Sequence, residues 1–353
     1  MSEAREALGA LSFAFGTPAC EAVFKQQAED FQVTEDLGFA LTGEGEHCCI
    51  QVSKRGVSTQ DVVRHLTRLA GVREQDIGYA GLKDRQGVCT QWFSIYVPGR
   101  ELDTALLPAP GVSILAVTRN SRKLRRGSHL GNHFRIVLRE LSGVNREDLE
   151  QRLCSVRDHG VPNYFGEQRF GRENRNVQEA RRLFSGELYL RRGYRRGLLI
   201  SAARSLLFNE ILSRRVQEGC WNRYLEGDVM NLEGTGSVFV PDTWDTVLAG
   251  RLAQHDIHPT GALWGLGELR SHAAAAALER DVASAHADLC AGLENVGLKQ
   301  ERRSLRLLVQ ALQWTFGDDE SLELNFGLPP GSYATTVLRE ICCLKEASGE
   351  EAG

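Results

Sequence analysis

Residues 78–91 have the sequence GYAGLKDRQGVCTQ, and the strand-like run WFSIYV follows directly at 92–97. The three glycines give the first run backbone freedom and let other chain segments approach closely. The run carries one carboxylate, Asp84, in a turn-forming segment before the strand. Loops on rigid supports are where reactive side chains concentrate, so Asp84 is a candidate for chemistry. Because Asp is also a favoured turn residue, the motif alone leaves a structural role open.

The segments around this run predict further strands and two capped helices. Ser58 and Asp61 form a capping-box pattern, and apolar residues then recur at helical spacing until Gly71. These residues are Val62, Val63, Leu66 and Leu69. Asn145 is the predicted cap of a second helix, which runs toward Arg157. Strands are predicted at 31–37, 48–54, 92–97, 112–117 and 134–138. Without regular alternation of strands and helices, the sequence favours an α+β fold with a mixed or largely antiparallel sheet.

The character of the chain changes at the aromatic, glycine-rich run of residues 160–171, which marks a boundary or a functional loop. Helices are predicted at 177–184, 201–217, 272–289 and 303–314, a strand at 322–326 and a last helix at 332–343, with 219–267 irregular. The closing strand and helix are more similar to the first half of the chain than to its middle. We therefore expect a middle domain inserted into a core that both ends of the chain build.

The length and composition of the chain limit the classes of protein to which it can belong. The chain has 353 residues, enough for two domains, and no apolar stretch of eighteen or more residues or signal-peptide pattern occurs. We expect a soluble, cytoplasmic protein without a membrane partner. The nine cysteines form no Cys-x-x-Cys pair and are expected to be reduced thiols, mostly buried. Since His255 and His258 lack a Cys or Glu framework, no metal site is predicted.

The net charge of −4 argues mildly against a nucleic-acid partner, but arginine is concentrated in three clusters. Any one cluster is explained by a solvated helix or loop face. Three of them in an acidic protein favour an anionic polymer, because guanidinium groups suit phosphates and bases. The clusters are Arg119, Arg122, Lys123, Arg125 and Arg126; Arg191, Arg192, Arg195 and Arg196; and Arg302, Arg303 and Arg306.

Six segments in the same order resemble the TruD family of tRNA pseudouridine synthases, from about residue 20 to about residue 345. They are EDF at 29–31 with Val33 and Glu35, GEGEH at 43–47, AGLKD at 80–84, GNHF at 131–134, GVPNYFG at 160–166 with QRFG at 168–171, and GSYAT at 331–335. The resemblance implies a pseudouridine synthase core with a mixed, largely antiparallel sheet and flanking helices, at 1–159 and 305–353. An inserted α/β TruD domain would occupy 160–304.

The resemblance also implies the reaction. A uridine of tRNA, uridine 13 in the D arm, would be isomerised to pseudouridine by a monomer that needs no cofactor, metal or obligate protein partner. Asp84 falls on the family's nucleophile. The N1–C1′ bond is broken, the base is turned and C5 is joined to the sugar, and a carboxylate suits the positive character that develops on the ribose. Attack on the sugar, attack on the uracil and a glycal route all remain open. Each route needs a general base that removes the C5 proton.

The resemblance places other residues around the substrate. Phe31, Asn132 and Tyr333 are expected to contact it, and Phe134 to lie against the flipped base. Core packing on strands is the alternative for the two phenylalanines. At position 333 the family's usual Phe is replaced by Tyr, which puts a purely stacking role in doubt.

Basic residues complete the expected site. Lys25 is the candidate partner that keeps Asp84 ionised and oriented, with an exposed surface lysine as the alternative. Lys83 is the second candidate, although a chain neighbour points to the opposite side. Arg169 is expected either to contact the RNA backbone or to cap a local loop.

Two other classes of function compete with an RNA-modifying isomerase. A purely RNA-binding protein would not need Asp84 in an intact motif. A glycoside hydrolase would need two facing acids, and the sequence shows no second acid in a comparable motif.

Overall fold

The structure is a computed structural model that describes residues 11–103 and 109–346. It consists of two compact units. The sheet unit comprises the described residues of Ala19–Glu150, Val309–Ala334 and Cys342–Gly353. The helical unit comprises those of Met1–Pro18, Gln151–Leu308 and Thr335–Ile341. The helical unit contains the whole of the predicted domain at 160–304 and extends beyond it at both ends, and the insertion itself stays a prediction.

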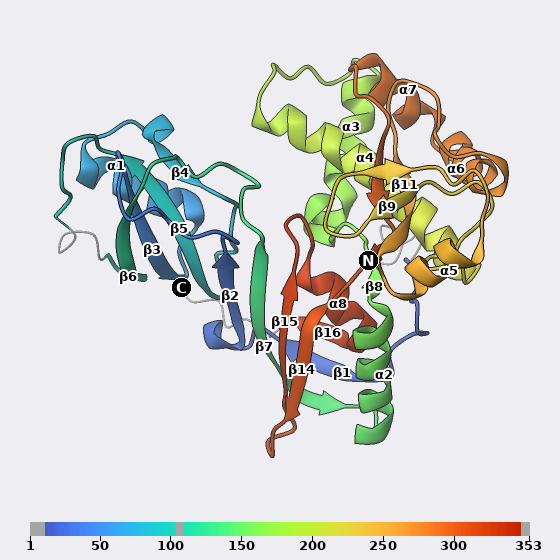
Figure 1. Cartoon of the computed structure of the whole chain (residues 1–353), viewed down its shortest axis with the longest axis horizontal. Helices are drawn as coiled ribbons and strands as arrows, with labels where there is room; N and C mark the ends of the chain where they lie inside the picture. Colours follow the sequence, from blue (N-terminus) through green and yellow to red (C-terminus); the bar gives the residue numbers. More distant parts are fainter. Residues whose placement is uncertain (1–10, 104–108, 347–353) are drawn as a thin grey trace. The chain divides into compact units, whose positions relative to one another are not determined.

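The sheet unit is built on one mixed sheet of ten strands, in which seven follow the order β14-β15-β7-β2-β5-β3-β6. The long strand β7 lies between β15 and β2 and also pairs with β1 (Figure 1). Two pairings, β2 with β5 and β1 with β16, are parallel, and the other pairings are antiparallel. The strands are β1 (Glu21–Phe24), β2 (Phe31–Asp36), β3 (His47–Arg55), β4 (Ile77–Tyr79), β5 (Val88–Tyr96), β6 (Val112–Asn120), β7 (Gly131–Ser142), β14 (Gln310–Phe316), β15 (Leu322–Leu328) and β16 (Cys343–Glu346). The predicted α+β class with a mixed, mostly antiparallel sheet is confirmed.

Helix α1 (Thr59–Ala70) covers part of this sheet and is bounded as predicted. The Ser58 hydroxyl accepts from the Asp61 N–H, the Asp61 carboxylate accepts from the Ser58 N–H, and Gly71 ends the helix in the left-handed region at φ 62°. The buried face packs into the core formed by β3 and β5. Leu69 was wrongly placed on this face: it is 40% exposed, because the helical spacing from Leu66 continues to Ala70.

The helical unit packs its helices around α4 (Tyr194–Gln217), whose buried residues contribute to two apolar clusters. Its other helices are α3 (Arg175–Phe184), α5 (Thr246–Ala253), α6 (Ala273–Ala285), α7 (Ala287–Asn295) and α8 (Ala334–Ile341), and α2 (Arg146–His159) enters it from the sheet unit. Its strands are β8 (Val161–Pro162), β9 (Met230–Leu232), β10 (Val238–Phe239), β11 (Ile257–Leu263), β12 (Glu301–Ser304) and β13 (Arg306–Leu307). In the described part of the chain, no helix is long and apolar enough to cross a membrane.

Three secondary-structure predictions for this region were wrong. Residues 303–314 form no helix: they contribute to β12, β13 and β14, whose backbones pair with β11, β8 and β15. The helix predicted at 272–289 is interrupted at His286, whose backbone leaves the helical region at φ −129° and ψ 41°. The segment 219–267, predicted to be irregular, contains three strands and α5.

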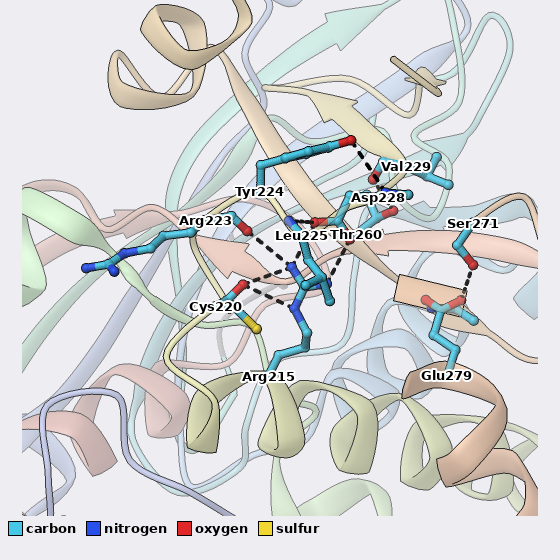
Figure 2. A network of polar contacts seen from close by, with 12 residues as sticks. Arg215, Cys220, Arg223, Tyr224, Leu225, Asp228, Val229, Thr260, Ser271 and Glu279 are labelled. Carbon is cyan, nitrogen blue, oxygen red and sulfur yellow. Dashed lines mark hydrogen bonds and ion pairs between the residues drawn. The ribbon is translucent and has the colours of Figure 1, made fainter. Parts of the chain in front are cut away.

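A buried ion pair fixes the loop that follows α4. Both terminal nitrogens of Arg215 lie 2.8 Å from the Asp228 carboxylate, and Arg215 also donates to the carbonyl groups of Cys220 and Arg223 (Figure 2). The Leu225 N–H donates to the same carboxylate at 2.7 Å. Because both charged side chains are buried, these contacts tie the loop to the helix in one arrangement.

Candidate active site

Asp84 lies in the loop between β4 and β5, with its side chain 39% exposed. The Lys25 Nζ is 3.3 Å from the Asp84 Oδ2. Lys25 directly follows β1 and adopts a positive φ of 59°, a conformation that is uncommon for a residue other than glycine. The structure therefore brings these two predicted residues together as one accessible ion pair.

Aromatic rings surround the Lys25 side chain. Its ammonium lies 3.9 Å from the centre of the Phe31 ring and 5.0 Å from that of Phe24, within cation–π range. The Phe31 ring is 6.1 Å from Phe134, which stacks on Phe326 at 5.4 Å. Phe31 and Phe134 are 3% and 8% exposed. Both rings therefore pack in the core, as the structural alternative predicted, while the Phe31 ring also borders the ion pair.

Lys83 is turned away from the carboxylate of its chain neighbour. Its Nζ lies 2.9 Å from the Glu35 Oε1, and both side chains are almost fully buried. Glu35 also accepts from the backbone N–H of Trp92 in β5 at 3.1 Å. Lys83 thus fastens the loop to β2, and Lys25 is the lysine that contacts the Asp84 side chain.

Two side chains donate hydrogen bonds to the backbone carbonyl of Asp84. The buried ammonium of Lys54 donates to the Asp84 carbonyl at 2.5 Å, and the Cys89 thiol donates to the same oxygen at 3.4 Å. Burial lowers the pKa of Lys54. Lys54 was not among the predicted site residues, although a signal was present: in β3 it continues the inward positions of Ile50 and Val52.

The rest of the loop is held by a short chain of hydrogen bonds. The Thr59 hydroxyl accepts from the Lys83 N–H at 3.0 Å and donates to the Gln91 Oε1 at 3.1 Å. The Gln91 amide in turn donates to the Gly81 carbonyl. Gly87, at φ 133°, is required, because a Cβ there would lie 2.5 Å from the Phe31 carbonyl oxygen. Contacts from α1, β2, β3 and β5 thus fix the loop that carries Asp84.

Asn132 lies at the start of β7 beside His129. Its Nδ2 is 3.5 Å from the His129 Nε2. The buried Asn132 Oδ1 and His129 Nδ1 have no hydrogen-bond partner among the described residues. Burial, followed by the charge of Lys83, lowers the pKa of His129. The Asn132 Oδ1 can therefore accept a further hydrogen bond, and the His129 Nδ1 can donate or accept one. No hydrogen bond joins Asn132 to Asp84 in the described structure.

Tyr333 and Arg169 are the two remaining predicted residues. Tyr333 is half-buried in the turn that precedes α8. Arg169 belongs to the helical unit, where it donates to the Ser201 hydroxyl at 3.0 Å and lies 5.6 Å from the centre of the Phe165 ring. Asn176 donates to the Arg169 carbonyl, so the residue supports its local loop.

The arginine clusters differ in what they do. Arg302 makes a buried two-bond contact with Glu279, and burial lowers the pKa of Arg306 to about 10. The expectation that all three clusters favour an anionic polymer is wrong for the cluster at 302–306, which stabilises the helical unit. Arg191 and Arg192 are exposed and make no ion pair with another described residue.

The His258 side chain and most cysteine side chains are buried. His258 is fully buried, with its Nε2 2.6 Å from the Glu233 carboxylate and its Nδ1 accepting from Arg306 at 2.7 Å. Six of the nine cysteine side chains are buried, in agreement with the prediction that most are, and the Cys342 thiol donates to the Cys20 Sγ at 3.1 Å. No group of three His, Cys, Asp or Glu side chains in the described ranges is placed to hold a metal ion.

Comparison with known proteins agrees with this architecture. The model of the family "tRNA pseudouridine synthase D (TruD)" matches residues 7–187 and 192–341. A tRNA pseudouridine synthase D from Nitrosococcus oceani is 47% identical over 343 residues, covering 96% of each chain, and one from Hydrogenovibrio crunogenus is 45% identical over 335 residues, covering 95% of this chain and 96% of the relative. The crystal structure of a candidate TruD protein from Methanosarcina mazei has the same fold, with a TM-score of 0.73 over 97% of this chain and 98% of that one at 21% identity. The chain belongs to the TruD family of tRNA pseudouridine synthases, which are isomerases.

Proposed function

We propose that the protein isomerises uridine 13 in the D arm of tRNA to pseudouridine, with Asp84 as the group that acts on the target nucleoside. The observation that carries the proposal is the ion pair between Asp84 and Lys25, 3.3 Å apart in a loop whose backbone is fixed from four elements. Family membership supports the tRNA substrate and the reaction, and the position in tRNA is what the sequence resemblance implies.

The geometry suits charge development at the ribose. An anionic Asp84 faces solvent while its backbone is held, so a flipped uridine could meet an oriented carboxylate. Lys25 would orient the Asp84 carboxylate before the substrate arrives. Once the N1–C1′ bond is broken, the uracil must turn so that its C5 meets C1′. A general base must also remove the proton from C5. Attack on ribose, attack on the base and a glycal route each fit this arrangement, and none consumes a cofactor.

The substrate contacts follow from the same proposal. The Phe31 ring borders the ion pair, and Phe134 packs behind it, so a turned base would meet the edge of this aromatic row. Asn132 and Tyr333 would contact the nucleoside, and Arg169 would contact the RNA backbone. Glu35 is buried and paired with Lys83, so it is not free to act as the second acid of a glycoside hydrolase.

The exposed arginines of the second cluster are proposed to contact RNA phosphates. The double variant Arg191→Ala, Arg192→Ala should weaken tRNA binding and reduce its salt dependence. The control pair Arg270→Ala, Arg280→Ala removes the same charge from two other exposed arginines of the helical unit. Unchanged affinity and salt slope in the Arg191 and Arg192 variant would place that cluster outside the RNA site.

Tritium release tests the proposed reaction. A tRNA transcript carrying 5-tritiated uridine is incubated with the purified protein and with its Asp84→Asn variant, without added metal. Release by the first protein and none by the variant supports uridine isomerisation that depends on Asp84. If neither protein releases tritium although both bind the RNA, the chain is better described as an RNA-binding protein or acts on a different RNA.

A further inference from the structure

We propose that Lys54 is a positioning residue for Asp84: its buried ammonium fixes the backbone of the loop and places a second positive charge against that loop. This inference rests on the proposed function, because it assigns Lys54 a role in the reaction for which Asp84 is the acting group. Lys54 would not touch the substrate, and its effect would pass through Asp84.

The hydrogen bonds of Lys54 match its donors one to one. An ammonium group has three N–H donors, and three carbonyl groups accept from it. These are the carbonyls of Asp84 at 2.5 Å, Val57 at 2.9 Å and Lys83 at 3.3 Å. Two of the three acceptors belong to the residues of the motif itself. The side chain is 1% exposed, so no exchange with bulk water loosens these contacts.

The charge is not needed to fill the strand face. Lys54 continues the inward row of Ile50 and Val52 on β3, where an apolar side chain would avoid the cost of burying an ammonium. Each of these three hydrogen bonds goes to a neutral carbonyl, and no carboxylate of a described residue forms an ion pair with Lys54. A buried cation kept at this cost, against the loop that carries the nucleophile, indicates a role for the charge.

The charged neighbours of Lys54 show where that charge acts. The titratable groups around it are Cys89 on β5, Asp84 and Lys83 in the loop, and Asp61 on α1. Lys83 is paired with Glu35, and Asp61 is exposed and bonded to Ser58 and Arg64. Asp84 is the acid whose own carbonyl Lys54 holds.

A buried charge is useful at a site that binds a polyanion. The phosphates of an approaching RNA disfavour a carboxylate at the site, and the partly exposed Lys25 is open to solvent ions and to the RNA itself. The buried ammonium of Lys54 is shielded from both. It therefore holds the backbone of Asp84 at every stage of binding, while Lys25 contacts the carboxylate directly.

The test is kinetic. Lys54→Met removes the charge and keeps the length of the side chain, and Lys345→Met makes the same substitution at an exposed lysine paired with Glu21. We expect Lys54→Met to lower kcat about 100-fold with little change in KM for tRNA, because a misplaced catalytic group loses rate at that scale. Lys345→Met should change neither.

A charge-keeping variant separates positioning from packing. Lys54→Arg should recover part of kcat, because it keeps a positive charge and N–H donors at this position. If Lys54→Met does not fold, Lys54→Gln is measured in its place. The inference is overturned if a folded variant without the charge retains kcat, or if its loss appears in KM for tRNA and not in kcat. Absence of tritium release by the unmodified protein would instead contradict the proposed function.

Discussion

The Lys25 ammonium lies 3.3 Å from the Asp84 carboxylate, although the two residues are 59 positions apart in the chain. Lys25 follows β1, which pairs with β7, and Asp84 precedes β5, which is joined to β7 through β2. One sheet therefore brings the two side chains together. The positive φ of Lys25 is a local cost of about 1 kcal/mol that the surrounding contacts offset.

Replacing Lys25 should impair the chemical step more than RNA binding. Lys25→Met removes the direct partner of Asp84, and kcat should fall about 100-fold while KM for tRNA changes little. Lys25→Arg should recover part of the rate, because it restores the charge. Single-turnover kinetics measures the step directly, with Lys345→Met as the control. A normal single-turnover rate in Lys25→Met would show that the ion pair has no role in the reaction.

Arg302→Met should destabilise the protein without a specific effect on RNA. The Arg302 and Glu279 side chains are each 3% exposed. Removing one partner of a buried ion pair lowers the free energy of unfolding by about 3–5 kcal/mol, because the other charge stays buried without a partner. Urea unfolding measures this loss. Arg191→Met, at an exposed position, should change the free energy of unfolding by less than about 0.5 kcal/mol. The assignment fails if Arg302→Met keeps its stability and loses tRNA affinity instead.

The free energy of unfolding should depend on the protonation of His129. Burial lowers its pKa below the ordinary 6.5, so the folded protein favours the neutral imidazole. As the pH falls below 6.5, the unfolded chain takes up a proton that the folded protein still refuses, and stability is lost until the lower folded pKa is passed. His129→Gln removes this contribution. Between about pH 7.5 and about pH 5.5 its free energy of unfolding should therefore fall less steeply than that of the unmodified protein, as measured by urea unfolding. Equal slopes would mean that His129 titrates alike in both states.

Local signals in the sequence predicted the elements around the site. The capping box at Ser58 and Asp61, the left-handed Gly71 and the apolar strand segments depend on neighbours in the chain, and the structure confirms them. The proximity of Lys25 and Asp84 followed from family resemblance, because nothing in either segment indicates the other.

Long-range pairing accounts for what the sequence did not show. Whether an arginine is exposed or buried against an acid depends on residues far along the chain, as with Arg302 and Glu279. The segment 303–314 contains apolar residues at spacings that fit helix or strand, and pairing with β8, β11 and β15 decided for strand. For Lys54, the only signal in the sequence was weak: a lysine continues the row of alternate inward positions formed by Ile50 and Val52.

The most direct measurement of the central claim is to locate pseudouridine in an unmodified tRNA transcript after incubation with the purified protein and with Asp84→Asn. The account predicts one pseudouridine, at uridine 13, with the unmodified protein and none with the variant, although the variant still binds the transcript. Pseudouridine formed by Asp84→Asn at the same rate, or an unchanged uridine 13 in transcripts that the folded protein binds, would contradict it.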